Sequence, residues 1–328
     1  MSGRSGVYRR IGALTGVCCL LTGSAAPALA GTGKPPVAFT ITDPRITESS
    51  GLAASLRHRG VVYTHNDSGA GARIFAVGPD GRTRAVLTLA GAAARDWEGI
   101  ALGPDERGRP SLYVGDIGDN LGGVWPYITV YRVPEPARLR DMTLRPTTFR
   151  LRYADGPRNA EALLVHPGTG RLYVASKLFG GALYRGPARL RSDRTNTLTK
   201  VGSAPSMATD GAFSPDGRTF TLRTYFSAHV FAAPDKLLRV VWLPGQQQGE
   251  SITYTPDGRS LLIGSEGAGQ PVYRVALPAE ALPPRPSPSS VAAPADPALR
   301  DTDGRRNALF IALAVGAALA YAVFRRRA

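Results

Sequence analysis

The sequence predicts an all-β protein, a five-bladed β-propeller, preceded by a signal peptide and followed by a single transmembrane helix. Three observations support this prediction: a short pattern that recurs five times, 38 glycines and 27 prolines among 328 residues, and apolar segments near both ends. Abundant glycine and proline disfavour an all-helical protein and favour short strands joined by turns. With 43% hydrophobic residues, the chain is also too apolar to be disordered throughout.

Each copy of the repeat begins with an acidic residue and small or aliphatic residues, and continues through a turn into a β-rich run. The five copies begin at Glu48, Glu98, Glu161, Asp210 and Glu250. A later run in each copy carries an aromatic residue, namely Phe75, Tyr131, Tyr184, Phe231 and Tyr273. Four-stranded units of this kind, repeated roughly every 40–60 residues, are typical of propeller blades.

The repeat also predicts how the ring closes. Fourth strands are expected at residues 85–89, 148–153, 197–201 and 238–243, whereas the last unit ends after its third strand at residues 273–277. Residues 37–41 precede the first copy, and we expect them to supply the missing outer strand and to cover the sheet edge. A sixth blade is the alternative, but residues 140–145 have no turn-bounded hydrophobic pattern to supply it.

The two ends predict an extracellular protein anchored in the cell membrane. Residues 1–30 have the basic start, apolar run and Ala-Leu-Ala cleavage signal of a secretory signal peptide. Residues 282–306 are rich in proline, serine and alanine, and predict a stalk. Residues 307–324 predict a membrane-spanning helix with the basic tail 325–328 in the cytoplasm, the alternative being a buried C-terminal helix. Residues 31–281 are then the propeller, which we expect to be monomeric.

Composition limits the partners and cofactors. The net charge is +15, but the basic residues are scattered without runs, so nucleic acid is not expected as a partner. Both cysteines, Cys18 and Cys19, lie in the signal peptide, so the mature protein has no disulfide. The chain also lacks Gly-x-Ser-x-Gly, His-Glu-x-x-His and phosphate-loop patterns, which disfavours serine-hydrolase, zinc-protease and kinase chemistry.

Two turns carry a resemblance to known propellers. Ser214-Pro215-Asp216-Gly217 and Thr255-Pro256-Asp257-Gly258 resemble the turns between the first two strands in TolB-like and tryptophan-aspartate-like repeats. The resemblance spans most of residues 46–277 and implies the architecture, because propellers host many different functions.

The repeated acids predict a metal site. The first strand of each blade lines the channel, so one residue from each copy should meet at one face: Ser50, Glu98, Glu161, Asp210 and Glu250. Clustered carboxylates need protonation, arginine partners or a cation. A donor set made only of oxygens suits Ca²⁺, so these five residues are the candidate calcium ligands.

The same positions resemble those of calcium-activated nucleotidases (apyrases), in which serine and acidic residues from five blades hold one axial Ca²⁺. Ser50, Glu98, Glu161 and Glu250 fit that pattern, while Asp210 stands where a second serine is expected. The segment that begins Glu98-Gly99-Ile100 is also similar to a motif of phytase-like esterase propellers. The resemblance implies calcium and hydrolysis of phosphoesters or esters, but the nucleotide-contacting loops have no counterpart here.

Further charged residues are expected around the ring. Four basic residues could form a rim that binds an anion, or could pair with neighbouring acids: Arg95, Arg158, Lys177 and Arg223. Three carboxylates are candidates for a general base: Asp67, Asp116 and Glu266. The sequence therefore predicts a membrane-anchored module that binds an anionic small molecule or a cell-surface glycan. The alternative function is a calcium-dependent hydrolase of phosphoesters or esters.

Overall fold

The structure, a computed structural model, describes residues 35–67 and 69–282. Within them, all regular structure is β-strand except a single turn of 3₁₀ helix, η1 (Ala279–Ala281), in a second unit that begins at Pro278. None of the helices in these residues is long and apolar enough to cross a membrane. The predicted signal peptide, transmembrane helix and basic tail, and the stalk after Leu282, lie outside the described residues.

The strands of the first unit form groups of antiparallel neighbours in chain order. The first group is β2 (Ser49–Ala54), β3 (Val62–Asn66), β4 (Arg73–Val77) and β5 (Thr83–Leu89). The second is β6 (Trp97–Pro104), β7 (Pro110–Asp116), β8 (Ile128–Pro134) and β10 (Thr147–Tyr153). The third is β11 (Ala160–Val165), β12 (Leu172–Ser176), β13 (Ala182–Arg185) and β14 (Asn196–Ser203). The fourth is β15 (Asp210–Phe213), β16 (Phe220–Arg223), β17 (Ser227–Ala233) and β18 (Lys236–Trp242).

The last group contains both ends of the unit, in the order β19 (Ile252–Tyr254), β20 (Ser260–Ile263), β21 (Pro271–Ala276) and β1 (Val37–Thr40). Strand β1 pairs antiparallel with β21, and Phe39 packs into a core with Leu262 and Val272. This pairing confirms the closing strand expected from the sequence. An apolar side chain at the strand's centre fixes it by burial as well as by backbone hydrogen bonds.

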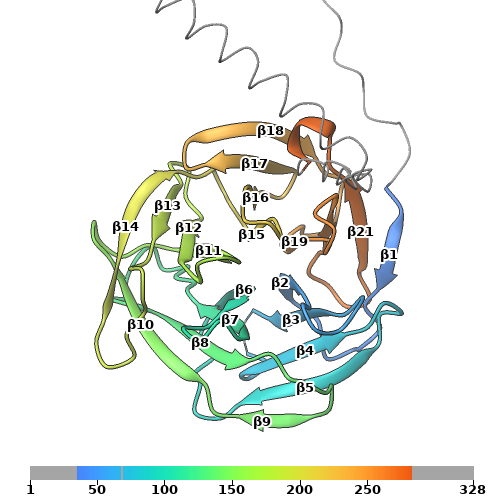
Figure 1. Ribbon diagram of the computed structural model, residues 1–328, viewed down its shortest axis with the longest axis horizontal. Helices are drawn as coiled ribbons and strands as arrows, with labels where there is room; N and C mark the ends of the chain where they lie inside the picture. Colours follow the sequence, from blue (N-terminus) through green and yellow to red (C-terminus); the bar gives the residue numbers. More distant parts are fainter. Residues whose placement is uncertain (1–34, 68, 283–328) are drawn as a thin grey trace, which may run out of the picture. The chain divides into compact units, whose positions relative to one another are not determined.

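The groups surround a common centre, which gives a propeller-like arrangement (Figure 1). The innermost strands β2, β6, β11, β15 and β19 contact one another in that order, and β19 contacts β2 again. Close approach requires small residues: a Cβ atom on Gly99 would lie 2.7 Å from the Leu163 Cβ on the neighbouring inner strand. Because this cycle is closed, the first residues of the five inner strands lie around the same end of the centre.

The hydrophobic core lies between adjacent groups of strands. One cluster joins the second and third groups through residues such as Phe149 and Tyr184, and another joins the third and fourth groups through Leu164 and Phe220. Alternate residues of each strand face these layers, as period-two side-chain geometry requires. The predicted fourth strands coincide with β5, β10, β14 and β18.

One strand was not expected. Strand β9 (Met142–Leu144) falls within residues 140–145 and adds to the free edge of β5 in parallel. The Asp141 carboxylate accepts a hydrogen bond of 2.9 Å from the Val86 N–H just before this pairing begins. The segment forms a strand because the neighbouring edge offers unpaired backbone groups, which no local pattern within it indicates.

The closing strand gives a testable prediction. Phe39→Ala should lower the free energy of unfolding by about 3 kcal/mol, because it leaves a cavity where β1 meets the core. Val37→Ala, on the exposed side of the same strand, should change it by less than about 0.5 kcal/mol. Urea unfolding monitored by tryptophan fluorescence measures both. Equal effects of the two substitutions would show that β1 does not hold the ring closed.

Candidate metal site at the acidic face

The repeated acids lie at the end of the unit where the inner strands begin, here called the acidic face. The five ring residues predicted from the sequence are at most 5% exposed: Ser50, Glu98, Glu161, Asp210 and Glu250. In β6 and β11 the strand register is irregular at Glu98 and at Glu161. A β-bulge leaves one residue outside the ladder and redirects its side chain, which turns these two carboxylates out of the regular pattern.

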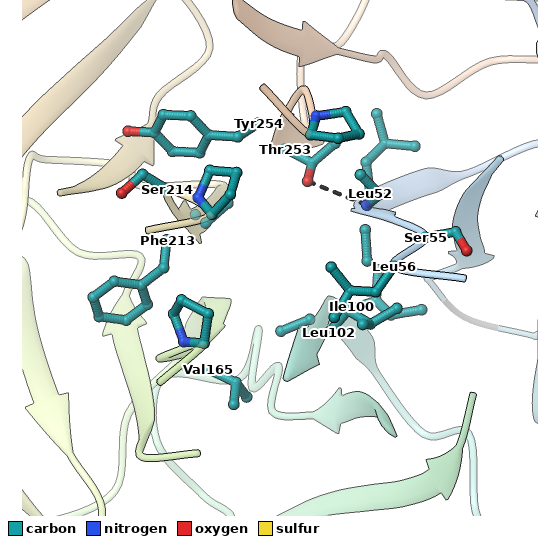
Figure 2. A pocket seen from close by; sticks show the side chains of 18 residues that line it. Leu52, Ser55, Leu56, Ile100, Leu102, Val165, Phe213, Ser214, Thr253 and Tyr254 are labelled. Carbon is teal, nitrogen blue, oxygen red and sulfur yellow. Dashed lines mark hydrogen bonds between the residues drawn. The ribbon is translucent and has the colours of Figure 1, made fainter. Parts of the chain in front are cut away.

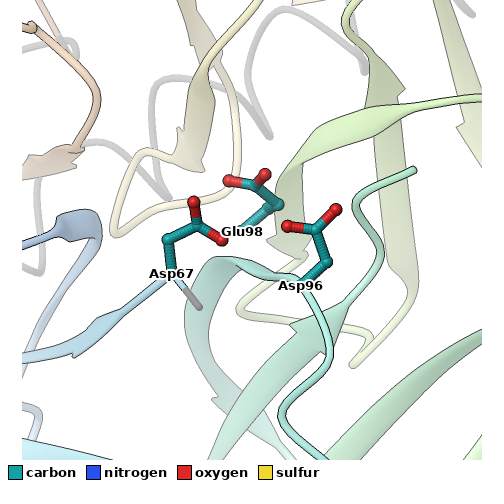
Figure 3. Close-up of side chains that lie close together, drawn as sticks. All are labelled: Asp67, Asp96 and Glu98. Carbon is teal, nitrogen blue, oxygen red and sulfur yellow. The ribbon is translucent and has the colours of Figure 1, made fainter. Parts of the chain in front are cut away.

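Asp67, Asp96 and Glu98 form a carboxylate cluster, in which one oxygen of each residue lies within 4.8 Å of the others (Figure 3). Asp67 follows β3, whereas Asp96 and Glu98 stand two residues apart at the start of β6. The Trp97 N–H donates a hydrogen bond of 3.0 Å to the Asp67 carbonyl oxygen. This bond ties the two segments together and fixes the spacing of their carboxylates.

The cluster has little compensating charge. Glu98 is 5% exposed, and its carboxylate makes no hydrogen bond or ion pair with the residues that the structure describes. Asp67 Oδ1 is buried and likewise has no partner among them. Burial, with repulsion from Glu161 and Asp67, raises the pKa of Glu98 well above its ordinary value. Burial, with a hydrogen bond to Asp96, raises the pKa of Asp67 to about 8.

Sequence reasoning named Glu98 as a candidate ligand and Asp67 as a candidate base, but it missed Asp96. The signal that could have found it is the Asp-x-Glu spacing in Asp96-Trp97-Glu98, because alternate residues of an extended segment face the same side. Its placement depends on a loop distant in the sequence. The N–H groups of Ile117 and Gly118 each donate a bond of 3.2 Å to the Asp96 carbonyl oxygen.

Asp116, a candidate base, lies behind this cluster. Its Oδ1 accepts a hydrogen bond of 3.0 Å from the Asp96 N–H and lies 3.6 Å from Arg95 Nε. Burial raises the pKa of Asp116, and the positive charge of Arg95 opposes that rise. Asp116 therefore supports the backbone that carries Asp96.

Lys177 lies beside two other carboxylates of the acidic face. Its Nζ lies 2.6 Å from Glu161 Oε1 and 3.9 Å from Glu250 Oε1, and 5.1 Å from the centre of the Tyr225 ring. Burial lowers the pKa of Lys177, but the two glutamates raise it by more, so the net shift is upward. Burial raises the pKa of Glu161 to about 8, against the opposing charge of Lys177. The positive charge of the Lys177 ammonium group therefore already compensates the carboxylates of Glu161 and Glu250.

The side chains of Ser50 and Glu266 belong to a hydrogen-bonded group on the acidic face. The Ser50 hydroxyl donates a hydrogen bond of 2.6 Å to Glu266 Oε1, and Gln248 Nε2 donates one of 2.6 Å to Glu266 Oε2. The same Gln248 nitrogen donates a bond of 3.2 Å to Glu250 Oε1. Burial raises the pKa of Glu266, and its negative charge contributes to the raised pKa of Asp67. Glu266 therefore stands near the cluster with both oxygens hydrogen-bonded.

Asp210 serves the backbone of neighbouring strands. Its Oδ1 accepts a hydrogen bond of 2.7 Å from Gly211 N–H, and its Oδ2 accepts one of 2.7 Å from Ile252 N–H. The ladder between β15 and β16 is regular at this point, unlike those at Glu98 and Glu161. Burial raises the pKa of Asp210, and the backbone hydrogen bonds oppose that rise. The structure gives its carboxylate the role of a link between β15 and β19.

The four predicted rim residues lie in different surroundings. Arg223 is buried and donates hydrogen bonds of 2.6 and 2.9 Å to the carbonyl oxygens of Ser251 and Gly264. Arg158 pairs with Asp155 at 2.9 Å and lies over the Tyr184 ring. The Arg95 guanidinium lies 4.3 Å from the centre of the Trp125 ring. Of the four, Lys177 and Arg95 lie beside the carboxylates of the acidic face.

No protein-family model matches the chain, and no curated protein matches it either. One similar solved structure is a gluconolactonase of Xanthomonas campestris, described as important in glucose secondary metabolic pathways. It is 15% identical, with 72% of this chain and 88% of that chain covered and a TM-score of 0.44. A likeness of this size carries no information about the activity of the present chain.

The raised pKa of Asp67 predicts a pH dependence. Because its pKa is about 8 in the folded protein against an ordinary value of 3.8, the folded state holds an extra proton between these values. Without divalent cations, stability should therefore fall as pH rises from about 5 to about 8. Added Ca²⁺ should restore stability more at about pH 8 than at about pH 5, because the metal competes with protons.

Thermal melts in chelator and in Ca²⁺ measure this dependence. Asp67→Asn supplies the comparison, because an amide cannot titrate, and its melting temperature in chelator should vary less with pH. An unchanged pH dependence in Asp67→Asn would remove Asp67 as its source.

Proposed function

We propose that this chain is a five-bladed propeller held at the outer surface of the cell membrane by residues 307–324, and that its acidic face binds Ca²⁺ and an anionic ligand. The cycle of five inner strands supports the blade count. The observation that carries the binding function is the uncompensated carboxylate of Glu98 within the cluster of Asp67 and Asp96. A buried carboxylate group of this kind is stabilised when a cation replaces the protons.

The donor set supports calcium. The cluster offers only carboxylate oxygens, which hard cations prefer, and both cysteines lie in the predicted signal peptide. Ca²⁺ takes 6–8 oxygen ligands in flexible geometry, so three residues leave coordination positions for water and for a ligand. The proposed site is therefore to one side of the axis, at Asp67, Asp96 and Glu98. Ser50, Glu161, Asp210 and Glu250 are not needed as direct ligands, because each already has a hydrogen-bond or ionic partner.

The surrounding charges support an anionic ligand. A ligand oxygen that completes the coordination of Ca²⁺ would lie on the same face as Lys177 and Arg95. Arg95 rests on the Trp125 ring, which orders the guanidinium before any ligand arrives. A carboxylate or phosphate group fits this combination of metal and basic side chains, whether it belongs to a small molecule or to an acidic glycan.

A calcium-dependent hydrolase of phosphoesters or esters is the second candidate. The observation that favours it is Glu266, a partly buried carboxylate near Asp67 with a raised pKa. Bound Ca²⁺ would supply a positive charge that orients the ester, and Glu266 would accept a proton from the attacking water. Cleavage of p-nitrophenyl phosphate or p-nitrophenyl acetate that requires Ca²⁺ and is lost in Glu266→Gln would favour this candidate.

Two glutamate variants test the position of the metal. Glu98→Gln should weaken Ca²⁺ binding by about tenfold or more, because it removes a direct ligand. Glu161→Gln should change the affinity by no more than about threefold, because Lys177 and not the metal neutralises that carboxylate. Isothermal titration calorimetry measures both affinities. Equal losses in the two variants would place the ion on the axis, and no binding by the unmodified protein would overturn the proposal.

Gly118 provides a test in which none of the proposed ligand residues is itself substituted. A Cβ atom on Gly118 would lie 2.3 Å from Asp96 Oδ2, so Gly118→Ala must push that carboxylate away. Displacing one ligand should weaken Ca²⁺ binding by about tenfold, with a smaller calcium-dependent rise in melting temperature. Gly245→Ala is the matched control, because a Cβ atom there meets open space. An unchanged affinity in Gly118→Ala would exclude Asp96 as a ligand.

A further inference from the structure

A separate cavity lies at the opposite end of the inner strands from the acidic face. It has a volume of about 130 Å³, and residues of all five inner strands line it (Figure 2). The apolar residues that line it include Leu52, Ile100, Leu102, Val165 and Phe213. The cavity is open to solvent on the side of the turns that join the first and second strands of each group.

The hydroxyl groups in the lining are already hydrogen-bonded within the protein. Thr253 Oγ1 accepts a bond of 3.3 Å from the Ala54 N–H, and Ser214 Oγ donates one of 2.6 Å to Asp216. The Tyr254 hydroxyl lies 2.6 Å from Thr221 Oγ1. These bonds leave mainly apolar surface for an occupant, which disfavours ordered water as the natural content.

The cavity is distinct from the acidic face. Gly211 and Leu52 line its inner end, and Asp210, next to Gly211, links β15 to β19 there through hydrogen bonds to the backbone. An occupant must therefore enter from the side of the turns. Its binding should not depend on calcium, because none of the three clustered carboxylates lines the cavity.

The turns around the opening carry more positive than negative charge. Within residues 55–61, 105–109, 166–171, 214–219 and 255–259 there are seven arginines and four carboxylates. The side chains of Arg57 and Arg218 are 42% and 67% exposed. The carboxylates of Asp105, Asp216 and Asp257 accept hydrogen bonds from the backbone of their own turns. Arg109 pairs with Asp105 at 2.7 Å, and Arg57 and Arg218 lie 4.0 Å from Glu135 and Asp216. The exposed Arg59, Arg107 and Arg259 are therefore the charges most available to an approaching partner.

We propose that this end of the propeller binds an acidic peptide segment of a partner protein, which inserts one phenylalanine or leucine side chain into the cavity. The volume supports a single apolar group, since an engineered apolar cavity of about 150 Å³ binds benzene. The rest of such a ligand must lie over the turns, where the arginines favour acidic residues. Apolar burial supplies the affinity of the anchor, and complementary charge orients the segment.

Fluorescence anisotropy with a labelled peptide, one phenylalanine flanked by aspartates and glutamates, tests the proposal on the full-length protein in detergent. Replacing that phenylalanine by alanine should weaken binding by about tenfold or more, because a buried aromatic side chain is lost. Chelation of calcium should leave the affinity unchanged. This result separates the cavity from the acidic face, whose own proposal can fail independently.

Protein variants locate the binding. Ala212→Leu should fill the cavity, since Ala212 lines it, and should weaken binding of the phenylalanine peptide about tenfold. Ala90→Leu, in the exposed turn just after β5, should not weaken it. Arg259→Glu in a turn at the opening should weaken binding more than Arg152→Glu on β10. Equal affinity for the phenylalanine and alanine peptides, or no binding of either, would overturn the proposal. The comparison of the phenylalanine and alanine peptides uses the unmodified protein, so it tests the proposal even where Ala212→Leu does not fold.

Discussion

The Lys177 ammonium determines how charge is distributed at the acidic face. Because it lies 2.6 Å from Glu161 and 3.9 Å from Glu250, two of the ring carboxylates have a positive neighbour inside the protein. Charges interact strongly where water is excluded, so this pairing leaves the neighbouring part of the ring as the less compensated part. The carboxylates of Asp67, Asp96 and Glu98 lie there, and they are the reason to expect a cation.

The position of a carboxylate along the chain does not decide its role; the local strand geometry does. Glu98 and Glu161 lie at irregular points of their ladders and project away from the sheet. Asp210 occupies the corresponding position in a regular ladder, and its oxygens bind backbone N–H groups of β15 and β19. Equivalent residues of a repeat can therefore project from the sheet in one copy and hold the framework in another.

The two ends of the inner strands differ in chemistry because the repeat places different residues at each end. Acids begin the inner strands, whereas the turns that follow them combine proline, glycine and arginine. As a result, one end presents buried carboxylates and the other presents an apolar cavity with arginines around it. Asp210 and the tight packing of glycines such as Gly99 lie between these ends and keep the centre closed.

The sequence by itself determined the strands other than β9, their grouping and the closing strand, because alternation, turn residues and repeat length act locally and recur in every copy. It also identified Glu98 as a candidate ligand and Asp67 as a candidate base on the same face, since both stand at strand ends. Only the tertiary structure decided that Asp96 joins them, that Lys177 neutralises Glu161, and that Arg223 is buried against backbone carbonyls. These outcomes depend on which segments distant in the sequence come within a few ångströms of one another, and on how a bulge turns each side chain, which no local pattern specifies.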